Sequence, residues 1–250
     1  MRRKLADSRA AAQRAIAEGF VRVGGVAEPR ASTLVSPADP VHLDETQRRF
    51  VGRGGRKLEA GIDRFGLSVV GRTAIDVGAS TGGFTDCLLQ RGAVAVTAVD
   101  VGYGQLDWRL RTDPKVTVVE RTNIRHADAA ALGAPFDLIV ADLSFISLRI
   151  VAGALAALGT ASSDWIVLVK PQFEVGRDQV GKGGVITDPA LHRSAIEGVE
   201  TAFEQVDLTM TGVVASPIRG AEGNREFLAW FRADGSETDH AAIAEALETP

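Results

Sequence analysis

The chain has a single cysteine, Cys87, so an internal disulfide is excluded. No run approaches the ~18 consecutive apolar residues that a membrane-spanning helix needs, and the first residues do not form the apolar core of a signal peptide. The histidines share no metal-ligand spacing with Cys87 or with one another; they are His42, His126, His192 and His240. We therefore expect a cytoplasmic protein with no metal site and no membrane insertion.

The sequence also has no internal repeat and no low-complexity tract. Its 250 residues are 45% hydrophobic and 24% charged, an ordinary balance for a globular protein. At roughly 100 to 200 residues per domain, this length allows one domain with an appendage, or two domains. We expect a monomer or a weak dimer.

Charge is unevenly distributed along the chain. Residues 1–60 hold 12 Lys and Arg against 7 Asp and Glu, whereas the whole chain has a net charge of −4, so the remainder is acidic. A basic segment on an acidic body suggests a polyanionic partner, although on charge alone a solvated basic face is the commoner explanation.

The basic segment has the pattern of a small helix-and-strand module. Asp7 and Ser8 are N-cap candidates for a helix that ends at Gly19 and displays Arg9 and Arg14. The runs 20–23 and 26–28 alternate around two glycines, which predicts a hairpin, and 41–43 predicts a further strand. Such a module is too small to hold much of a core and favours a binding role.

From about residue 70, apolar runs alternate with helical segments. Strands are predicted at 73–77, 95–101, 116–120, 136–142 and 165–170, and helices at 83–91, 105–111, 146–158 and 189–204. The fold class is therefore α/β, with a doubly wound, mostly parallel sheet covered on both faces. The runs 208–215 and 226–231 lack a long helix between them and predict an antiparallel edge, and the Ala-rich tail predicts a final helix.

Ligands of doubly wound sheets bind beyond the carboxyl ends of the strands, so the loop after 73–77 is the first candidate site. It has a serine, Ser80, where a dinucleotide-binding G-x-G-x-x-G loop has its second glycine, which disfavours NAD or FAD. Residues 78–82 also spell G-x-S-x-G, the nucleophile elbow of α/β-hydrolases, but that elbow expects earlier strands in the sheet.

The same loop fits S-adenosylmethionine. Its glycines allow close backbone approach, Asp76 can face the methionine ammonium, and Asp100 lies at the end of the second strand, about 20 residues on, where a ribose ligand is expected. A plain glycine turn in front of a buried helix carrying Cys87 is the alternative that remains open.

Residues at the other strand ends indicate which kind of acceptor atom such a methyltransferase would methylate. Cys87 lies on the helix behind the loop, which disfavours a cysteine nucleophile for carbon methylation, and residues 142–145 read Asp-Leu-Ser-Phe rather than the Asn/Asp-Pro-Pro-aromatic loop of amine methylation. Methyl transfer to a poorly acidic sugar hydroxyl needs a positioned base or a cation that stabilises developing alkoxide. A set of two lysines and two carboxylates is available: Lys57, Asp142, Lys170 and Glu226.

Seven motifs in register over roughly residues 5–232 resemble the TlyA family. They are the segments 51–58, 76–85, 99–106, 120–125, 142–147, 170–176 and 223–227, and the linker motif Arg-x-Trp-Val corresponds to Arg48-Arg49-Phe50-Val51. The family's opening Arg-Leu-Asp is missing, so we expect a shortened RNA-binding module.

The resemblance implies an S-adenosylmethionine-dependent enzyme that methylates the ribose 2′-hydroxyl of cytidine in ribosomal RNA. It implies a Rossmann-like class I, FtsJ-like catalytic domain over 61–235, a ribosomal-protein-like module over 1–45, a linker over 46–60 that carries a catalytic lysine, and a tail over 236–250. The catalytic residues would be Lys57, Asp142, Lys170 and Glu226. The cofactor-binding residues would be Asp76, Gly78, Ala79, Ser80, Thr81, Gly82, Gly83, Phe84, Asp100, Val101, Asn123 and Asp142.

Four arginines are predicted to contact RNA phosphates on ribosomal subunits: Arg9, Arg14, Arg53 and Arg56. Two rival hypotheses come from other classes of protein. A non-catalytic ribosome-associated protein would not bind S-adenosylmethionine, and a membrane-lytic protein, as the family's historical label of hemolysin implies, would carry an apolar or amphipathic insertion segment, which the sequence does not show.

Overall fold

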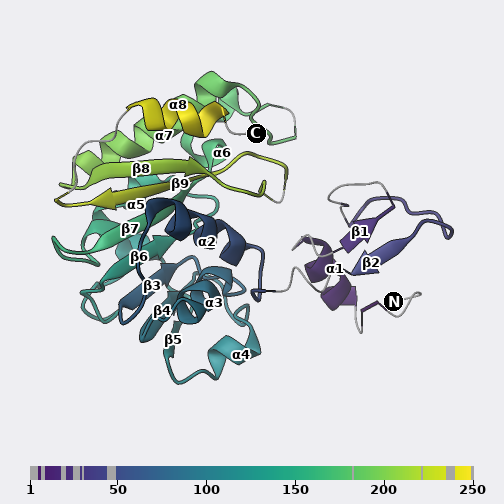
Figure 1. Cartoon of the computed structure of the whole chain (residues 1–250), viewed down its shortest axis with the longest axis horizontal. Coiled ribbons are helices and arrows are strands. Elements are labelled where there is room, and N and C mark those ends of the chain that lie inside the picture. Colours follow the sequence, from purple (N-terminus) through teal and green to yellow (C-terminus); the bar gives the residue numbers. More distant parts are fainter. Residues whose placement is uncertain are drawn as a thin grey trace. The chain divides into compact units, whose positions relative to one another are not determined.

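The computed structural model describes residues 5–6, 9–17, 21–24, 29, 31–43, 49–181, 183–220, 222–234 and 240–248. The chain divides into two compact units, Met1–Arg53 and Gly54–Pro250 (Figure 1). Within the described residues, no helix is both long and apolar enough to cross a membrane.

The first unit contains helix α1 (Arg9–Ala17) and strands β1 (Val21–Val23) and β2 (Val41–Leu43). The two strands pair antiparallel, with Val21 opposite Leu43, and the Gly24 amide extends the ladder by donating to the Pro40 carbonyl at 2.9 Å. The described partner of 21–23 is thus 41–43, whereas residues 26–28, the second strand of the expected hairpin, lie outside the described residues. A glycine pair is a local turn signal, whereas this pairing joins segments far apart in sequence.

The second unit is built on a seven-stranded sheet in the order β5-β4-β3-β6-β7-β9-β8. The parallel strands are β3 (Thr73–Val77), β4 (Ala95–Val99), β5 (Val116–Val119), β6 (Leu138–Ala141) and β7 (Asp164–Val169). Strands β8 (Thr209–Ala215) and β9 (Phe227–Arg232) run antiparallel at one edge. The α/β fold with an antiparallel edge is confirmed.

Burial explains why these runs form strands. Every residue of β6 and β7 is buried, as expected for central strands that are covered on both faces. Each observed strand agrees with its predicted run to within one or two residues at either end.

Helices cover both faces of the sheet (Figure 1). Helix α2 (Gly54–Phe65) packs on α3 (Gly83–Gln90) and on the β8–β9 edge. Helix α5 (Leu148–Ala156) packs on α7 (Pro189–Glu204), and the short α6 (Pro171–Glu174) also contacts α7. Helix α8 (His240–Glu248) lies on β8. Side-chain caps from Ser147 and Asp188 explain where α5 and α7 begin.

Two helices differ from expectation. The predicted helix at 105–111 is a single turn, α4 (Trp108–Arg111), because the Asp107 side chain caps it by accepting from the Arg109 amide. Residues 54–65, which include the second half of the expected linker, form α2 of the larger unit. Its Gly-Gly start has poor helix propensity, and packing on α3 overrides that local preference.

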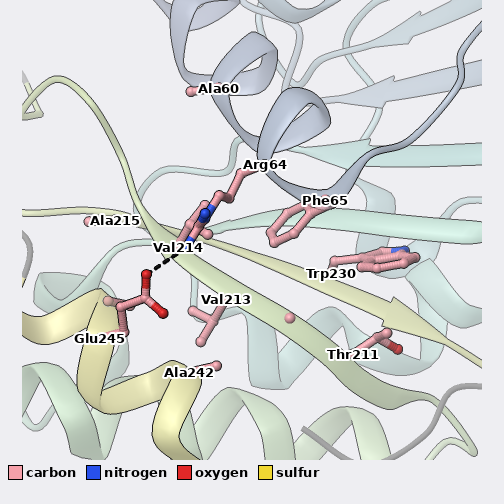
Figure 2. Close-up of a pocket in the computed structure, with 12 residues that line it drawn as sticks. Ala60, Arg64, Phe65, Thr211, Val213, Val214, Ala215, Trp230, Ala242 and Glu245 are labelled. Atoms are coloured by element: carbon pink, nitrogen blue, oxygen red, sulfur yellow. Dashed lines mark hydrogen bonds and ion pairs between the residues drawn. The ribbon is translucent and has the colours of Figure 1, made fainter. Parts of the chain in front are cut away.

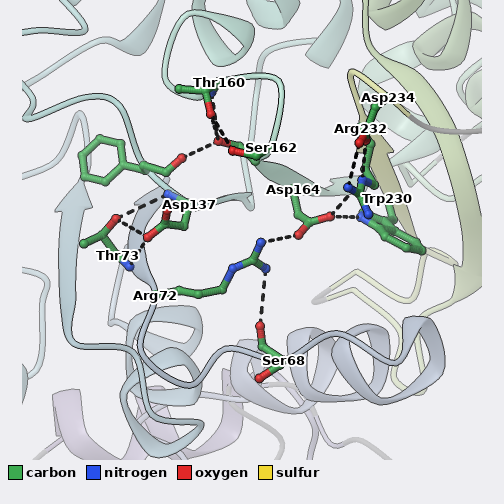
Figure 3. Close-up of polar contacts among 12 residues, drawn as sticks. Ser68, Arg72, Thr73, Asp137, Thr160, Ser162, Asp164, Trp230, Arg232 and Asp234 are labelled. Carbon is green, nitrogen blue, oxygen red and sulfur yellow. Dashed lines mark hydrogen bonds and ion pairs between the residues drawn. The ribbon is translucent and has the colours of Figure 1, made fainter.

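A polar cluster ties the amino-terminal ends of the strands together (Figure 3). Asp164, the buried first residue of β7, pairs with Arg72 at 2.5 Å and accepts from the Trp230 indole of β9 at 2.8 Å. Thr73 at the start of β3 donates to Asp137 just before β6 through both its amide and its hydroxyl. These contacts satisfy polar groups within the structure. They lie at the amino-terminal ends of the parallel strands, whereas the predicted site lies at the carboxyl ends.

Candidate active site

The predicted cofactor loop turns sharply between β3 and α3. Gly78 and Gly82 have φ of +88° and +97°, and Ser80 between them has φ of +49°. The Gly78 and Ala79 amides both donate to the Val99 carbonyl of β4, at 2.8 and 3.1 Å. A Cβ at Gly78 would lie 2.5 Å from the Asp142 carbonyl oxygen. Glycine is therefore required there by both conformation and close approach.

Asp76 is fully buried below this loop. Its Oδ2 accepts from the Thr85 amide at 2.9 Å and from the Thr85 hydroxyl at 2.6 Å, whereas Oδ1 has no hydrogen-bond partner among the described residues. Burial raises the pKa of Asp76 from 3.8 to about 7, against the lowering effect of the two Thr85 hydrogen bonds. A buried carboxylate oxygen without a partner fits a cationic ligand group, such as the ammonium of a bound amino acid.

Asp100 links the cofactor loop to the chain after β4. Its Oδ2 accepts from the Ser80 amide at 2.8 Å and its Oδ1 from the Gly102 amide at 2.6 Å, which fixes the orientation of the carboxylate. Val101 follows it and is 68% exposed, and Asn123, after β5, is also exposed. Because β3, β4 and β5 are adjacent and parallel, these residues share one edge of the sheet with the loop.

The predicted catalytic residues form two ion pairs, also at the carboxyl ends of the parallel strands. Lys170 Nζ lies 2.6 Å from Asp142 Oδ1, and Lys57 Nζ lies 2.5 Å from Glu226 Oε2. Asp142 follows β6 and Lys170 follows β7, and Glu226 precedes β9, whose Phe227 is paired with Val169 of β7. Both lysines and Glu226 are buried.

Lys57 reaches the sheet edge from helix α2, whose first turn lies beside the cofactor loop. A Cβ at Gly54 would be 3.5 Å from the Phe84 ring and 3.9 Å from Asp142 Oδ2. The amino end of α2 thus lies between the loop and the Asp142 carboxylate, where the positive end of the helix dipole favours a negative charge.

Three residues near the ion pairs have roles that the sequence did not assign. Ser144 Oγ accepts a hydrogen bond from Lys170 Nζ at 2.9 Å. Phe145 is 92% exposed in the left-handed region with φ of +65°, and its ring centroid lies 5.5 Å from that of Phe173. All three residues lie in motifs that carry the family resemblance. The sequence alone does not show that the Phe145 ring is exposed, because its exposure depends on the backbone conformation of the loop.

Glu174 holds this loop in place from helix α6. It is buried, and it accepts from the Ser147 hydroxyl at 2.5 Å and from the Leu148 amide at 2.8 Å. Burial raises the pKa of Glu174, opposed by these two hydrogen bonds. The carboxylate at the first turn of α5 therefore anchors the segment that follows Phe145.

The predicted RNA-binding arginines fall in both units. Arg9 is exposed on α1, which also carries Arg14, whose side chain lies outside the described residues. Arg53 ends the first unit and Arg56 lies in the first turn of α2, and both are half-buried.

A separate groove of about 630 Å³ lies between α2, β8 and α8 (Figure 2). Phe65 and Trp230 line it, and an exposed ion pair of 2.5 Å joins Arg64 to Glu245 across it. None of the predicted catalytic or cofactor-binding residues lines this groove. Among the residues that the structure describes, no group of three His, Cys, Asp or Glu side chains could hold a metal ion.

Comparison with known proteins identifies the family. A family model described as FtsJ-like methyltransferase matches residues 50–233. The chain belongs to this family. As an FtsJ-like methyltransferase it uses S-adenosylmethionine, and the orphaned Asp76 oxygen, the glycine-lined approach at Gly78 and the fixed Asp100 carboxylate fit that cofactor.

Three relatives place this FtsJ-like methyltransferase within the TlyA family. It is 45% identical to the 16S/23S rRNA (cytidine-2′-O)-methyltransferase TlyA of Mycobacterium tuberculosis, over 99% of this chain and 92% of that protein. It is 37% identical to Hemolysin A of Brachyspira hyodysenteriae, over 90% of this chain and 94% of that protein. A solved structure of a Lactococcus lactis protein proposed to be a hemolysin matches with a TM-score of 0.77 and 41% identity, covering 80% of this chain and 98% of that one. The resemblance to the TlyA family is confirmed.

Proposed function

We propose that this TlyA-family protein transfers a methyl group from S-adenosylmethionine to the ribose 2′-hydroxyl of a cytidine in ribosomal RNA. The observation that carries the proposal is the pairing of Lys170 with Asp142 and of Lys57 with Glu226 at the sheet edge that carries the cofactor loop. The rRNA methyltransferase activity named for the Mycobacterium tuberculosis relative supports the choice of substrate.

The bound cofactor supplies an electrophilic methyl group on a sulfonium. Asp76 would hold its ammonium and Asp100 would accept from its ribose hydroxyls, while the turn from Gly78 to Phe84 would line the rest of the site, with Val101 and Asn123 at the adjoining strand ends.

The two ion pairs serve the acceptor hydroxyl. As the new O–C bond forms and the S–CH3 bond breaks, with neutral S-adenosylhomocysteine as the leaving group, the 2′-hydroxyl would lose its proton to the Asp142 carboxylate of the Lys170–Asp142 pair. The lysine cations would stabilise the negative charge that develops on the oxygen. Ser144 and Asp142 hold Lys170 Nζ from two sides, and Glu226 holds Lys57. Because the site is pre-formed, little reorganisation is needed for the transfer.

The surface around the site suits an unpaired nucleotide. Tyr103, Trp108 and Phe145 are 68%, 71% and 92% exposed, and they follow the carboxyl ends of β4 and β6. The Arg121 guanidinium lies 4.2 Å from the centre of the Tyr103 ring. Exposed aromatic and arginine planes are surfaces on which RNA bases stack. The target cytidine is turned out of its helix, and its base stacks on Phe145.

The basic first unit and the arginines of both units contribute the phosphate contacts. Arg9, Arg14, Arg53 and Arg56 neutralise RNA phosphates and position the substrate without reading its sequence. The protein acts on rRNA as a monomer or weak dimer in the cytoplasm.

The decisive experiment measures transfer of labelled methyl from S-adenosylmethionine to unmodified ribosomal subunits, with the label mapped by ribose-methylation-sensitive primer extension. The wild type should label a cytidine ribose, and Lys170→Ala should lower the rate by at least 100-fold. Lys115→Ala is the matched control, because Lys115 is exposed and directly precedes β5, at the amino-terminal ends of the strands and away from the site. Equal rates for the Lys170 and Lys115 variants would contradict the assignment of Lys170.

The same preparation separates the rival functions. Cofactor binding by calorimetry without methyl transfer to any RNA would exclude this substrate, and failure to bind S-adenosylmethionine would favour a non-catalytic ribosome-associated protein. Leakage of lipid vesicles caused by the purified protein would instead favour a membrane-lytic one.

A further inference from the structure

The turn that carries Glu226 is joined to a distant loop by one buried amide. Asn224 is 1% exposed, and its Oδ1 accepts from the Ile186 amide at 2.8 Å. Its Nδ2 donates to the Gly184 carbonyl at 2.8 Å. Both ends of the side chain are thus used, one as acceptor and one as donor, against the backbone that precedes α7. An amide carries a carbonyl acceptor and an NH2 donor on one planar group, so neither an ionised aspartate nor a leucine at this position could make both bonds.

A second residue holds the same loop from α7. His192 is 2% exposed, and its Nε2 donates to the Ile186 carbonyl at 3.1 Å, so that Ile186 is bound through both its amide and its carbonyl. The ring also packs edge-on against Phe227, the residue after Glu226, with centroids 5.7 Å apart. Burial lowers the pKa of His192, which favours the neutral ring.

The backbone of Asn224 closes a turn against the Glu226 carboxylate. The Asn224 carbonyl accepts from the Gly220 amide at 2.8 Å, and a Cβ at the buried Gly220 would lie 2.5 Å from Glu226 Oε1. The Ser216 amide donates to the Glu226 carbonyl at 2.8 Å. The turn therefore leaves little room on the Oε1 side, while Oε2 pairs with Lys57.

We propose that Asn224 is a positioning residue, which holds Glu226, and through it Lys57, in place for methyl transfer by tying the β8–β9 turn to the loop before α7. The inference rests on the proposed function and deepens it. Asn224 touches neither substrate nor cofactor. It acts through Glu226, so its loss should lower the rate of the chemical step and leave cofactor binding nearly unchanged.

The test compares Asn224→Ala with Ser163→Ala. Ser163 is the matched control because it is equally buried and donates to the Phe136 carbonyl at 2.6 Å, on the opposite edge of the sheet. We expect Asn224→Ala to lower kcat for ribosomal subunits by about 10- to 100-fold. The dissociation constant for S-adenosylmethionine and the KM for subunits should change by less than about threefold, and Ser163→Ala should lower kcat by less than about twofold.

A double-mutant cycle distinguishes positioning from general loss of structure. In a Glu226→Gln background, Asn224→Ala should lower kcat by less than about twofold further, because the group it positions is already altered. An Asn224 effect of equal size in both backgrounds, or one no larger than that of Ser163→Ala, would overturn the inference. Absence of transfer by the wild type would overturn the proposed function as well.

His192→Phe keeps the inference testable if Asn224→Ala folds poorly. Phenylalanine preserves the packing on Phe227 but cannot donate to the Ile186 carbonyl, and it removes the buried Nδ1 that has no partner among the described residues. We expect an unchanged or higher melting temperature together with a roughly threefold to tenfold lower kcat. In the Glu226→Gln background, His192→Phe should lower kcat no further. A variant with full wild-type kcat would contradict the role of this loop.

Discussion

Single residues at this site are held in states that they would not adopt in water. Asp76 is the clearest case, because burial raises its pKa to about 7 and leaves one oxygen without a partner among the described residues. The raised pKa also affects stability. Ionisation of Asp76 is harder in the folded protein than in the unfolded chain, so the free energy of unfolding should fall as pH rises from about 4 to about 7.

Cofactor binding should show the opposite dependence on pH. Below pH 7 the ammonium group must expel the Asp76 proton, so affinity for S-adenosylmethionine should rise by up to about tenfold per pH unit until about pH 7. It should fall again above about pH 8, where a free α-amino group loses its own proton. Calorimetry across this range should give a maximum between these values.

Asp76→Asn should bind the cofactor more weakly and lose the rising limb of this curve. Asp137→Asn is the control, since Asp137 pairs with Thr73 at the other end of the sheet and should leave the curve unchanged. A rising limb that persists in Asp76→Asn would show that another group titrates on binding.

At the scale of elements, the segment between β6 and α5 is held at both ends and exposed in the middle. At the start of the segment, Asp142 and Ser144 bind Lys170. At its end, Ser147 binds Glu174. Between them, Phe145 is displayed to solvent with a left-handed backbone, a conformation that costs a non-glycine residue about 1–2 kcal/mol. Such strain is retained where neighbouring contacts enforce it, and it is typical of functional sites.

Phe145→Ala should therefore separate activity from stability. The side chain is 92% exposed, so the free energy of unfolding in urea should change by less than about 0.5 kcal/mol. Loss of one base-stacking surface, worth about 1–3 kcal/mol, should lower kcat/KM for ribosomal subunits by about 5- to 150-fold. Val70→Ala, at a 75% exposed position between α2 and β3, should leave kcat/KM unchanged. A large loss of stability without loss of activity would argue that Phe145 is structural.

At the scale of the whole molecule, charge and chemistry are divided between the two units. The first unit is basic, whereas the proposed catalytic and cofactor-binding side chains belong to the unit that begins at Gly54. We propose that the first unit contributes affinity that does not depend on RNA sequence, and that the second contributes the reaction.

Salt dependence tests this division. The logarithm of the RNA association constant falls with the logarithm of salt concentration with a slope of about −0.7 to −0.9 per phosphate contact. Replacing both Arg9 and Arg14 by alanine should make the slope shallower by up to about 1.4 to 1.8 and leave cofactor affinity unchanged. Unchanged RNA affinity at low salt would exclude these two arginines as phosphate contacts. Lys115→Ala should behave as wild type.

The sequence by itself determined the order of the strands along the chain, the parallel sheet with its antiparallel edge, and the family. Apolar runs, glycine turns and helix caps act over a few residues, so their signals survive in a linear reading; the helix Pro189–Glu204, capped by Asp188, was predicted to the residue. It also nominated the two lysines and two carboxylates, because Asp142, Lys170 and Glu226 stand at predicted strand ends and Lys57 stands in a glycine-flanked segment before the sheet begins.

Only the tertiary structure decided which of these groups meet and what holds them. The pairing of Lys57 with Glu226 spans 169 positions in the chain, and Asn224 binds a loop 38 and 40 positions away. Likewise, β1 pairs with 41–43, a segment distant from it in the sequence, and Gly54–Phe65 is a helix despite its two leading glycines. Long-range packing fixes these contacts, and no local pattern in the sequence encodes them.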